Sequence, residues 1–263
     1  LLSVYLDASF FPNLNKLDFA QEGHRIEFKE DSKEIEIKGV VYNEMKGAMS
    51  SVTSQLWHGM SKHLYPSSTY QYNSGGNPED ILDLTHDELI EFHKTHYHPS
   101  NAIFLTSGNL NPEEIQSYIE KNVLTNFKPL KKEISVDNEI RFTSPKTASE
   151  IYNPQPGDED NHHVVLSWLL GESHNPEELL ETYLLSSILL DNSASPLRKV
   201  LENTNLGKSL SPLTGLDADQ KELVFAAGLE GVSSNQEKDI ENLIINCLEN
   251  LAKNGVDNSL VSS

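Results

Sequence analysis

One acidic side chain, Glu44, stands inside the apolar, strand-like stretch from Gly39 to Gly47, and any fold of this chain must accommodate it. Burying an unpaired carboxylate is costly, so a buried Glu finds a cation, hydrogen-bond donors or a metal, or takes up a proton. Three interpretations of Glu44 are open at this stage: an acid in the first turn of a helix, one half of a buried ion pair, or a ligand of a divalent metal.

Five segments around Glu44, taken in order, resemble a known family. They are Leu1–Pro12, Gln21–Arg25 (Gln-Glu-Gly-His-Arg), Asn43–Gly47 (Asn-Glu-Met-Lys-Gly), Ser74–Pro78 and Tyr97–Ala102. With these segments the chain resembles the presequence-protease and falcilysin branch of the pitrilysin or insulinase-type zinc peptidases. The resemblance implies repeated α/β domains around a peptide chamber, one catalytic zinc ion, and unfolded peptides as substrates. It also implies that Glu44 is the third protein ligand of that zinc.

In that family the other two ligands and the general base come from an upstream helix with the motif His-x-x-Glu-His. The sequence holds no such pentapeptide, as its histidine pairs show: His58 and His63 have no Glu between them, His93 and His96 enclose only Lys94 and Thr95, and His162 and His163 are adjacent. The chain also begins at Leu1, which the family reaches only after that helix. We therefore expect an internal fragment of a larger protease, with no catalytic residue of its own, an incomplete zinc site and no hydrolytic activity alone.

The amino-acid composition limits the classes of binding partner and the cellular compartment that we expect for this chain. The 263 residues are 37% hydrophobic, which is enough for a real core. Forty acidic against twenty basic residues give a net charge of -20, which argues against a nucleic-acid partner. No stretch has the length of a membrane span, so no membrane partner is expected. A single cysteine, Cys247, excludes an internal disulfide and a Cys-rich zinc site, and favours a cytoplasm or organelle matrix. Helical spacing places Cys247 in a core with Ile244, Leu248 and Leu251.

Short-range patterns predict the elements of the first half. Period-two runs at Arg25–Phe28 and Glu34–Lys38, with a polar turn between them, predict an antiparallel hairpin. Gly39–Asn43 is expected to continue as a strand or as the approach to one, and Glu44–Met60 to form a helix. The other predictions are a helix ending at Phe11, a loop at Leu64–Pro78 with Tyr65, Tyr70 and Tyr72 packed inward, a helix from the Thr85 capping box to Tyr97, a strand at Ile103–Gly108, and a helix from Asn111 to Val123.

The order of strand, helix and strand begins again in the second half. The predicted elements are a strand at His163–Leu170, a helix from Asn175 to Leu190, a short helix at Ser195–Glu202, a strand at Leu223–Gly231 and an amphipathic helix at Lys238–Lys253. Together the elements indicate an α+β fold with helices packed on mostly antiparallel sheets. With the resemblance, residues 1–130 are expected to be the C-terminal part of the first, catalytic peptidase domain, 131–149 a linker, and 150–263 the N-terminal part of a second, peptidase-like domain.

Two other functions stay open. One is a non-catalytic module of a pitrilysin-like protein that binds peptides or only supports the structure. The other is a zinc-storage or sensor site built on His93, His96 and His98, because two imidazoles three apart on one helix can share an ion. The alternative interpretation of these histidines is that they hydrogen-bond a turn. Asn43 and Lys46 could support Glu44 from nearby, or could simply be solvated.

Overall fold

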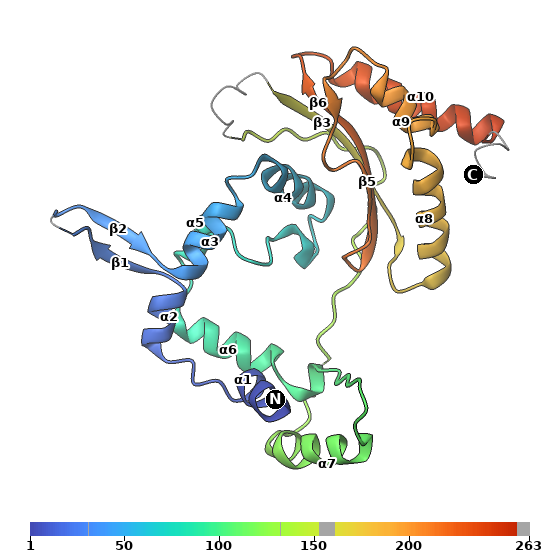
Figure 1. The fold of residues 1–263 in the computed structure, drawn as a ribbon. Helices are drawn as coiled ribbons and strands as arrows, with labels where there is room; N and C mark the ends of the chain where they lie inside the picture. The colour runs from blue at the N-terminus through green and yellow to red at the C-terminus, as the bar shows by residue number, and fades with distance from the viewer. Residues whose placement is uncertain (31, 132, 153–160, 257–263) are drawn as a thin grey trace. The chain divides into compact units, whose positions relative to one another are not determined.

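The computed structural model describes residues 1–30, 32–131, 133–152 and 161–256. Within it the chain forms two compact units (Figure 1). Unit 1 comprises Leu1–Ala48 and Gly75–Val136, and unit 2 comprises Met49–Ser74 and the described part of Asp137–Ser263. Among the described residues, no helix has both the length and the apolar character that a membrane span requires.

Unit 1 is mainly helical, with one small sheet. Its elements are α1 (Leu2–Phe10), α2 (Lys16–Glu22), β1 (Arg25–Phe28), β2 (Ile35–Lys38), α3 (Val40–Ala48), α5 (Pro78–Ile81), α6 (His86–His96), η2 (Pro99–Asn101), α7 (Pro112–Asn122) and η3 (Leu124–Asn126). Its core brings α1 onto α7, where Leu6, Ile119 and Val123 are buried and Phe10 and Phe127 pack against them.

The predicted hairpin of β1 and β2 is confirmed. Ile26 pairs with Ile37 and Phe28 pairs with Ile35, so one face of the hairpin is apolar. The opposite face carries ion pairs: Glu27 lies 2.6 Å from Arg25 and 3.2 Å from Lys38. Hydrogen bonds from these two cations hold the pKa of Glu27 below its ordinary value.

Local sequence signals also determine where the helices α6 and α7 begin. The hydroxyl of Thr85 accepts a hydrogen bond from the Glu88 N–H, and the Glu88 carboxylate accepts one from the Thr85 N–H, which is the predicted capping box. In α7 the side chain of Asn111 accepts a hydrogen bond from the Glu113 N–H at 3.0 Å, and Pro112 occupies the first helical position.

One strand prediction for unit 1 is wrong, and a second is not met among the described residues. The run Gly39–Asn43 is not a strand, because α3 already begins at Val40. Gly39 lies so close to the backbone of Gly23 that a Cβ atom would come within 2.0 Å of the Gly23 carbonyl oxygen, and this tertiary contact overrides the strand preference of the valines. The segment Ile103–Gly108 also contains no strand, since none of the described residues pairs with it.

Unit 2 is built on an antiparallel sheet. Its elements are α4 (Val52–Leu64), η1 (Thr69–Gln71), β3 (His162–Glu172), α8 (Pro176–Leu190), α9 (Pro196–Glu202), β4 (Ser209–Leu210), β5 (Gly215–Asp217), β6 (Glu222–Val232) and α10 (Glu237–Asn254). The strand order is β3-β6-β4, and β5 also pairs with β6. The prediction of one helix from Glu44 to Met60 is wrong, because the chain forms two helices there, α3 and α4. Ser51 caps the start of α4: its side chain accepts a hydrogen bond from the Ser54 N–H.

The two faces of β6 are covered by different helices. Phe225, Ala227 and Leu229 belong to the core that α8, α9 and α10 form on one face (Figure 1). On the other face Val224 packs with Leu64 and Tyr65 at the end of α4. The predicted strands β3 and β6 and the helix α10 are confirmed, and the fold is the expected α+β class with helices on an antiparallel sheet.

The single cysteine also lies where helical spacing predicted. Cys247 packs against the core under α10, and burial raises the pKa of its thiol. The division of the chain into domains at 131–149 stays a prediction. The compact units differ from it in one respect, because Met49–Ser74 belongs to unit 2.

Candidate functional site

Glu44 is exposed and lies in the middle of α3. It is the fifth residue of the helix, so it is not an acid of the first turn. Among the described residues no cation forms an ion pair with it, and it takes part in no side-chain hydrogen bond. Two of the three interpretations of Glu44, the helix-start acid and the buried ion pair, are therefore wrong. A carboxylate in this state can still serve as one ligand of a metal.

The described residues do not complete a metal site around Glu44. No group of three or more His, Cys, Asp or Glu side chains is close enough to hold an ion in the part of the chain that the structure describes. A structural or catalytic zinc ion needs three or four protein ligands. Glu44 can therefore be one ligand of a zinc ion, but the described residues do not supply the others. The neighbours Asn43 and Lys46 are exposed as well, as the solvated interpretation predicted.

The three clustered histidines do not converge on a common point. His93 Nε2 donates to the Ser9 carbonyl oxygen at 2.9 Å, and its ring stacks on Tyr97. His96 stacks on Phe92, and its Nδ1 lies 3.2 Å from the Phe92 carbonyl oxygen. His98 Nδ1 accepts a hydrogen bond from the Ser100 N–H at 3.1 Å. The zinc-storage site is therefore wrong. The prediction that these histidines hydrogen-bond a turn is confirmed for His98, whereas His93 bonds to α1 and His96 to its own helix.

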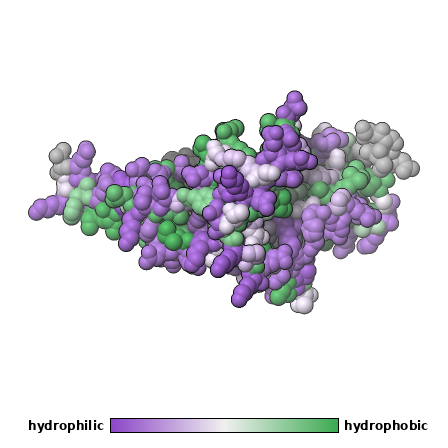
Figure 2. Space-filling model, turned by 90° about the horizontal axis from the view of Figure 1, so that it is seen from below, coloured by the Kyte–Doolittle hydropathy of each residue, from purple (hydrophilic) through white to green (hydrophobic). Residues whose placement is uncertain are grey.

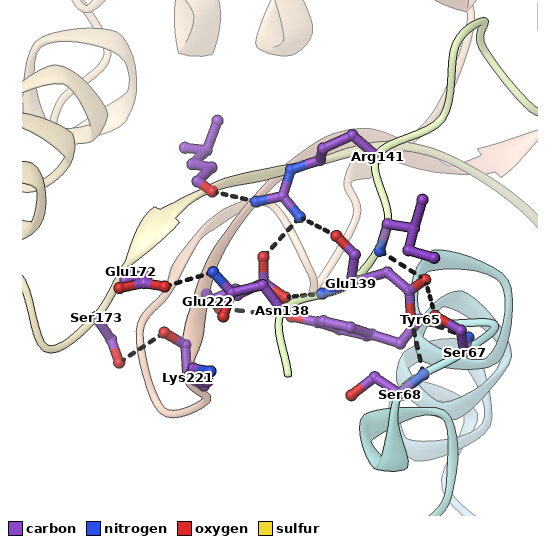
Figure 3. A network of polar contacts seen from close by, with 12 residues as sticks. Tyr65, Ser67, Ser68, Asn138, Glu139, Arg141, Glu172, Ser173, Lys221 and Glu222 are labelled. Atoms are coloured by element: carbon purple, nitrogen blue, oxygen red, sulfur yellow. Dashed lines mark hydrogen bonds and ion pairs between the residues drawn. The ribbon is translucent and has the colours of Figure 1, made fainter. Parts of the chain in front are cut away.

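The most elaborate polar cluster lies in unit 2, where four segments meet (Figure 3). Glu222 at the start of β6 is only 1% exposed, and its Oε1 lies 2.6 Å from Nη1 of Arg141. Its Oε2 accepts a hydrogen bond from the Glu139 N–H at 2.7 Å. Arg141 also donates to the carbonyl oxygens of Leu170 at 2.6 Å and Glu139 at 3.2 Å. We call Glu139, Arg141 and Glu222 the anchor cluster.

The second carboxylate of the anchor cluster is satisfied without a cation. Glu139 accepts hydrogen bonds from the Ser67 hydroxyl at 2.6 Å and from the N–H groups of Ser67, Ser68 and Ile140 at 2.9–3.0 Å. Burial raises the pKa of Glu139, but these hydrogen bonds lower it more, so the pKa lies below the ordinary value of 4.5. The cluster thus binds residues 139–141 to the loop after α4.

Tyr65 lies between the anchor cluster and the apolar core around Val224. It is fully buried, its ring lies 5.4 Å from that of Tyr70, and its hydroxyl donates to the Glu222 carbonyl oxygen at 3.4 Å. Burial, and then the charge of Glu222, raises the pKa of Tyr65 above its usual range. The predicted inward packing of the loop tyrosines is confirmed for Tyr65 and Tyr70. It is wrong for Tyr72, which is 69% exposed.

The anchor cluster is structural in character. Its carboxylates and its guanidinium are used in contacts within the protein, and it presents no nucleophile beside a base. The anchor cluster was hard to predict from sequence, because residues 139 and 141 fall inside the stretch interpreted as a linker. The one available signal was Glu222, a charge directly before the apolar run of β6.

Comparison with known proteins assigns the family. Residues 83–263 match the family model described as the peptidase M16 inactive domain. The chain belongs to the peptidase M16 family. The M16 match confirms the predicted resemblance to pitrilysin-type peptidases. Glu44 lies outside the matched residues, so its role is not tested by the match.

Curated relatives agree with the M16 assignment. The mitochondrial presequence protease of Xenopus laevis is 37% identical over 265 residues, which cover 98% of this chain and 26% of the relative. Protein HypA of Clostridium perfringens is 34% identical over 269 residues, or 100% of this chain and 27% of that protein. The chain thus spans about a quarter of the length of these relatives.

Solved structures share the M16 fold at low identity. The peptidase M16 inactive domain from Pseudomonas fluorescens aligns with 99% of this chain and 57% of its own, with a TM-score of 0.65 and 15% identity. A putative M16-like peptidase from Alicyclobacillus acidocaldarius aligns with 98% of this chain and 68% of its own, with a TM-score of 0.56 and 15% identity. These likenesses confirm the fold class and say nothing of activity.

The lowered pKa of Glu139 predicts how the stability of unit 2 depends on pH. A carboxyl whose pKa is lower in the folded state binds more protons when unfolded, so its contribution is present above about pH 4.5 and is lost as the pH falls through the folded pKa. We expect the unfolding free energy of unit 2 to fall as the pH drops below about 4.5, and to fall less steeply in Glu139→Gln. Both tryptophans, Trp57 and Trp168, lie in unit 2, so urea titrations followed by tryptophan fluorescence measure it. An equal slope in the variant would contradict the assignment.

Proposed function

We propose that this chain is part of a zinc-dependent metalloendopeptidase of the M16 family that degrades unstructured peptides, and that these 263 residues do not hydrolyse peptides alone. The observation that carries the proposal is the 37% identity to a presequence protease over 98% of the chain. The Asn-Glu-Met-Lys-Gly run of this chain, which resembles the family's ligand motif, supports it. The match to an inactive domain supports the second part.

Within this proposal Glu44 contributes one carboxylate ligand to the zinc ion. Its exposure and its lack of a described partner leave both oxygens available for coordination. The other ligands and the general base are then supplied by residues outside this chain. When bound, an open-site zinc ion lowers the pKa of a water molecule and polarises a carbonyl group.

The proposed substrates are extended, unfolded peptides, which bind to peptidase sheets as an added strand. A net charge of -20 favours basic peptides over acidic ones and disfavours nucleic acid. The remaining domains of the same polypeptide are the other proposed partners. We place the protein in the cytoplasm or an organelle matrix, because several relatives are named as mitochondrial and the chain has a single cysteine.

A second candidate function is a non-catalytic module that binds peptides or supports the structure of an M16 protein. The description of the matched family model as an inactive domain favours it. It differs from the first proposal in needing neither zinc nor Glu44.

The test uses the longer protein to which the chain belongs. We expect it to contain zinc and to cleave an unstructured fluorogenic peptide, with the cleavage stopped by a chelator and restored by added zinc. The 263-residue chain, assayed beside it, should cleave nothing. A folded longer protein without zinc and without cleavage would replace the first proposal by the second.

A further inference from the structure

A segment of unit 1 without helix or strand, Ile103–Ser107, begins with the side-chain pattern of a β-strand. It follows η2, and Ala102 before it already has extended dihedral angles, with φ -117° and ψ 143°. Ile103 and Leu105 are 98% and 91% exposed. Phe104 between them is less exposed, at 37%, and its ring lies 5.7 Å from that of Phe10. Over Ile103–Leu105 the middle side chain therefore contacts α1 while its two neighbours lie in solvent, which is the alternation of a strand.

The backbone of this segment is unpaired. None of the hydrogen bonds among the described residues involves an N–H or C=O group of Ile103–Ser107. A row of free N–H and C=O groups beside exposed apolar side chains is a ready template for another strand. Exposed residues of this size are expected to be covered in a stable domain, because burying each contributes about 1.5–3 kcal/mol.

Unit 1 offers little sheet for the segment to join. Its only described strands are β1 and β2, which pair with each other along their full length. A lone two-stranded hairpin is marginally stable in water. Its apolar face is also open: Ile26 is 72% exposed, Phe28 70% and Ile35 65%, and apolar surface is visible on the left in Figure 2.

We infer that Ile103–Ser107 is a strand of a larger sheet, and that its hydrogen-bonding neighbour is a strand from another part of the same polypeptide, outside these 263 residues. The length of the relatives supports this occupant, because the chain spans only 26% of the Xenopus laevis protease. The solved M16 inactive domain likewise holds further chain, since this one covers 57% of it. Such a neighbour must itself present apolar side chains at alternate positions, to cover Ile103 and Leu105. The inference does not depend on peptidase activity.

Amide hydrogen exchange tests the inference directly. We expect the amides of Ile103–Leu105 to exchange at least about 100-fold more slowly in the longer protein than in the 263-residue chain. Equal exchange in the two proteins would overturn the inference. Protection that grows with the concentration of the short chain would also overturn it, in favour of a second copy as the neighbour. Protection of the longer protein only after an unfolded peptide is added would assign the edge to substrate instead.

A matched pair of substitutions gives an independent test. Ile103→Asp and Ile151→Asp change the same residue type at 98% and 99% exposure in this chain. We expect neither to alter the thermal unfolding of the 263-residue chain, and Ile103→Asp alone to lower the Tm of the longer protein. Equal effects of the two substitutions in the longer protein would count against a strand at Ile103. If Ile103→Asp prevents folding altogether, the exchange experiment on the unaltered proteins still decides.

Discussion

Replacing Glu44 with glutamine in the longer protein is expected to remove most of its zinc and to lower peptide hydrolysis by at least about 100-fold. Substituting residues that merely support a metal ligand costs 10–100-fold in metal affinity or activity, so loss of a ligand should reach or exceed that range. The fold should survive, because Glu44 is exposed and makes no described ion pair, and surface substitutions of this kind stay within about 0.5 kcal/mol. Zinc content, thermal unfolding and initial rates are measured on the same preparation.

Two companion variants separate coordination from charge. Glu120→Gln makes the same change at an exposed glutamate in α7, where no ion pair is described, and should leave zinc and activity unchanged. Glu44→Asp keeps the carboxylate but shortens the side chain by one methylene, so partial zinc binding is expected. If Glu44→Gln retains zinc and rate in a folded protein, Glu44 is not the ligand and the motif resemblance has been carried over wrongly at this position.

The parts of the fold that the sequence predicted correctly depend on neighbours close in the chain. The hairpin of β1 and β2 follows from two period-two runs joined by a short turn. The start of α6 follows from Thr85 and Glu88, three residues apart. The helix α10 follows from apolar residues at helical spacing, including Cys247. In each case the interacting residues lie within a few positions of one another, so a local pattern contains the information.

The failures have a common physical cause, which is contact between distant residues. Gly39–Asn43 has strand-forming side chains, but the close approach of Gly39 to the Gly23 backbone starts a helix instead. Ile103–Gly108 has the pattern of a strand but lacks a partner in the described chain. The anchor cluster could not be predicted, because Glu139 is bonded to residues 72 and 83 positions away.

The candidate site divides in the same way. Glu44 was found from the Asn-Glu-Met-Lys-Gly run and its resemblance to a family motif, which a sequence alone displays. Its exposure was not predicted, because the valines before it suggested a buried strand and they lie in an exposed part of α3 instead. The clustered histidines illustrate the converse: close spacing in sequence suggested shared ligation, whereas their ring nitrogens bond to separate backbone groups.

Removing the guanidinium of Arg141 should destabilise unit 2 more than neutralising the carboxylate of Glu222. Arg141→Met leaves the carboxylate of Glu222, 1% exposed, without its cation, and we expect a loss of about 3 kcal/mol in the unfolding free energy. This is the lower end of the range for buried pairs, because the Arg141 side chain is 47% exposed and water screens the pair in part. Glu222→Gln keeps an oxygen that can accept a hydrogen bond from the Glu139 N–H, and it leaves Arg141 solvated. We therefore expect it to lower the unfolding free energy by only about 1 kcal/mol.

The double variant tests whether the two losses share one cause. If Arg141→Met is costly because it leaves a buried charge, adding Glu222→Gln should recover part of the stability, with a coupling of about 1 kcal/mol or more. Arg198→Met is the matched control: Arg198 pairs with Glu202 one helical turn away on a partly exposed face, and its loss should cost no more than about 0.5 kcal/mol. Urea titrations followed by the fluorescence of Trp57 and Trp168 report on unit 2 alone, which avoids treating the two units as one transition. Additive losses, or equal losses for Arg141→Met and Arg198→Met, would show that the Glu222 carboxylate is stabilised by its backbone hydrogen bonds and not by the guanidinium.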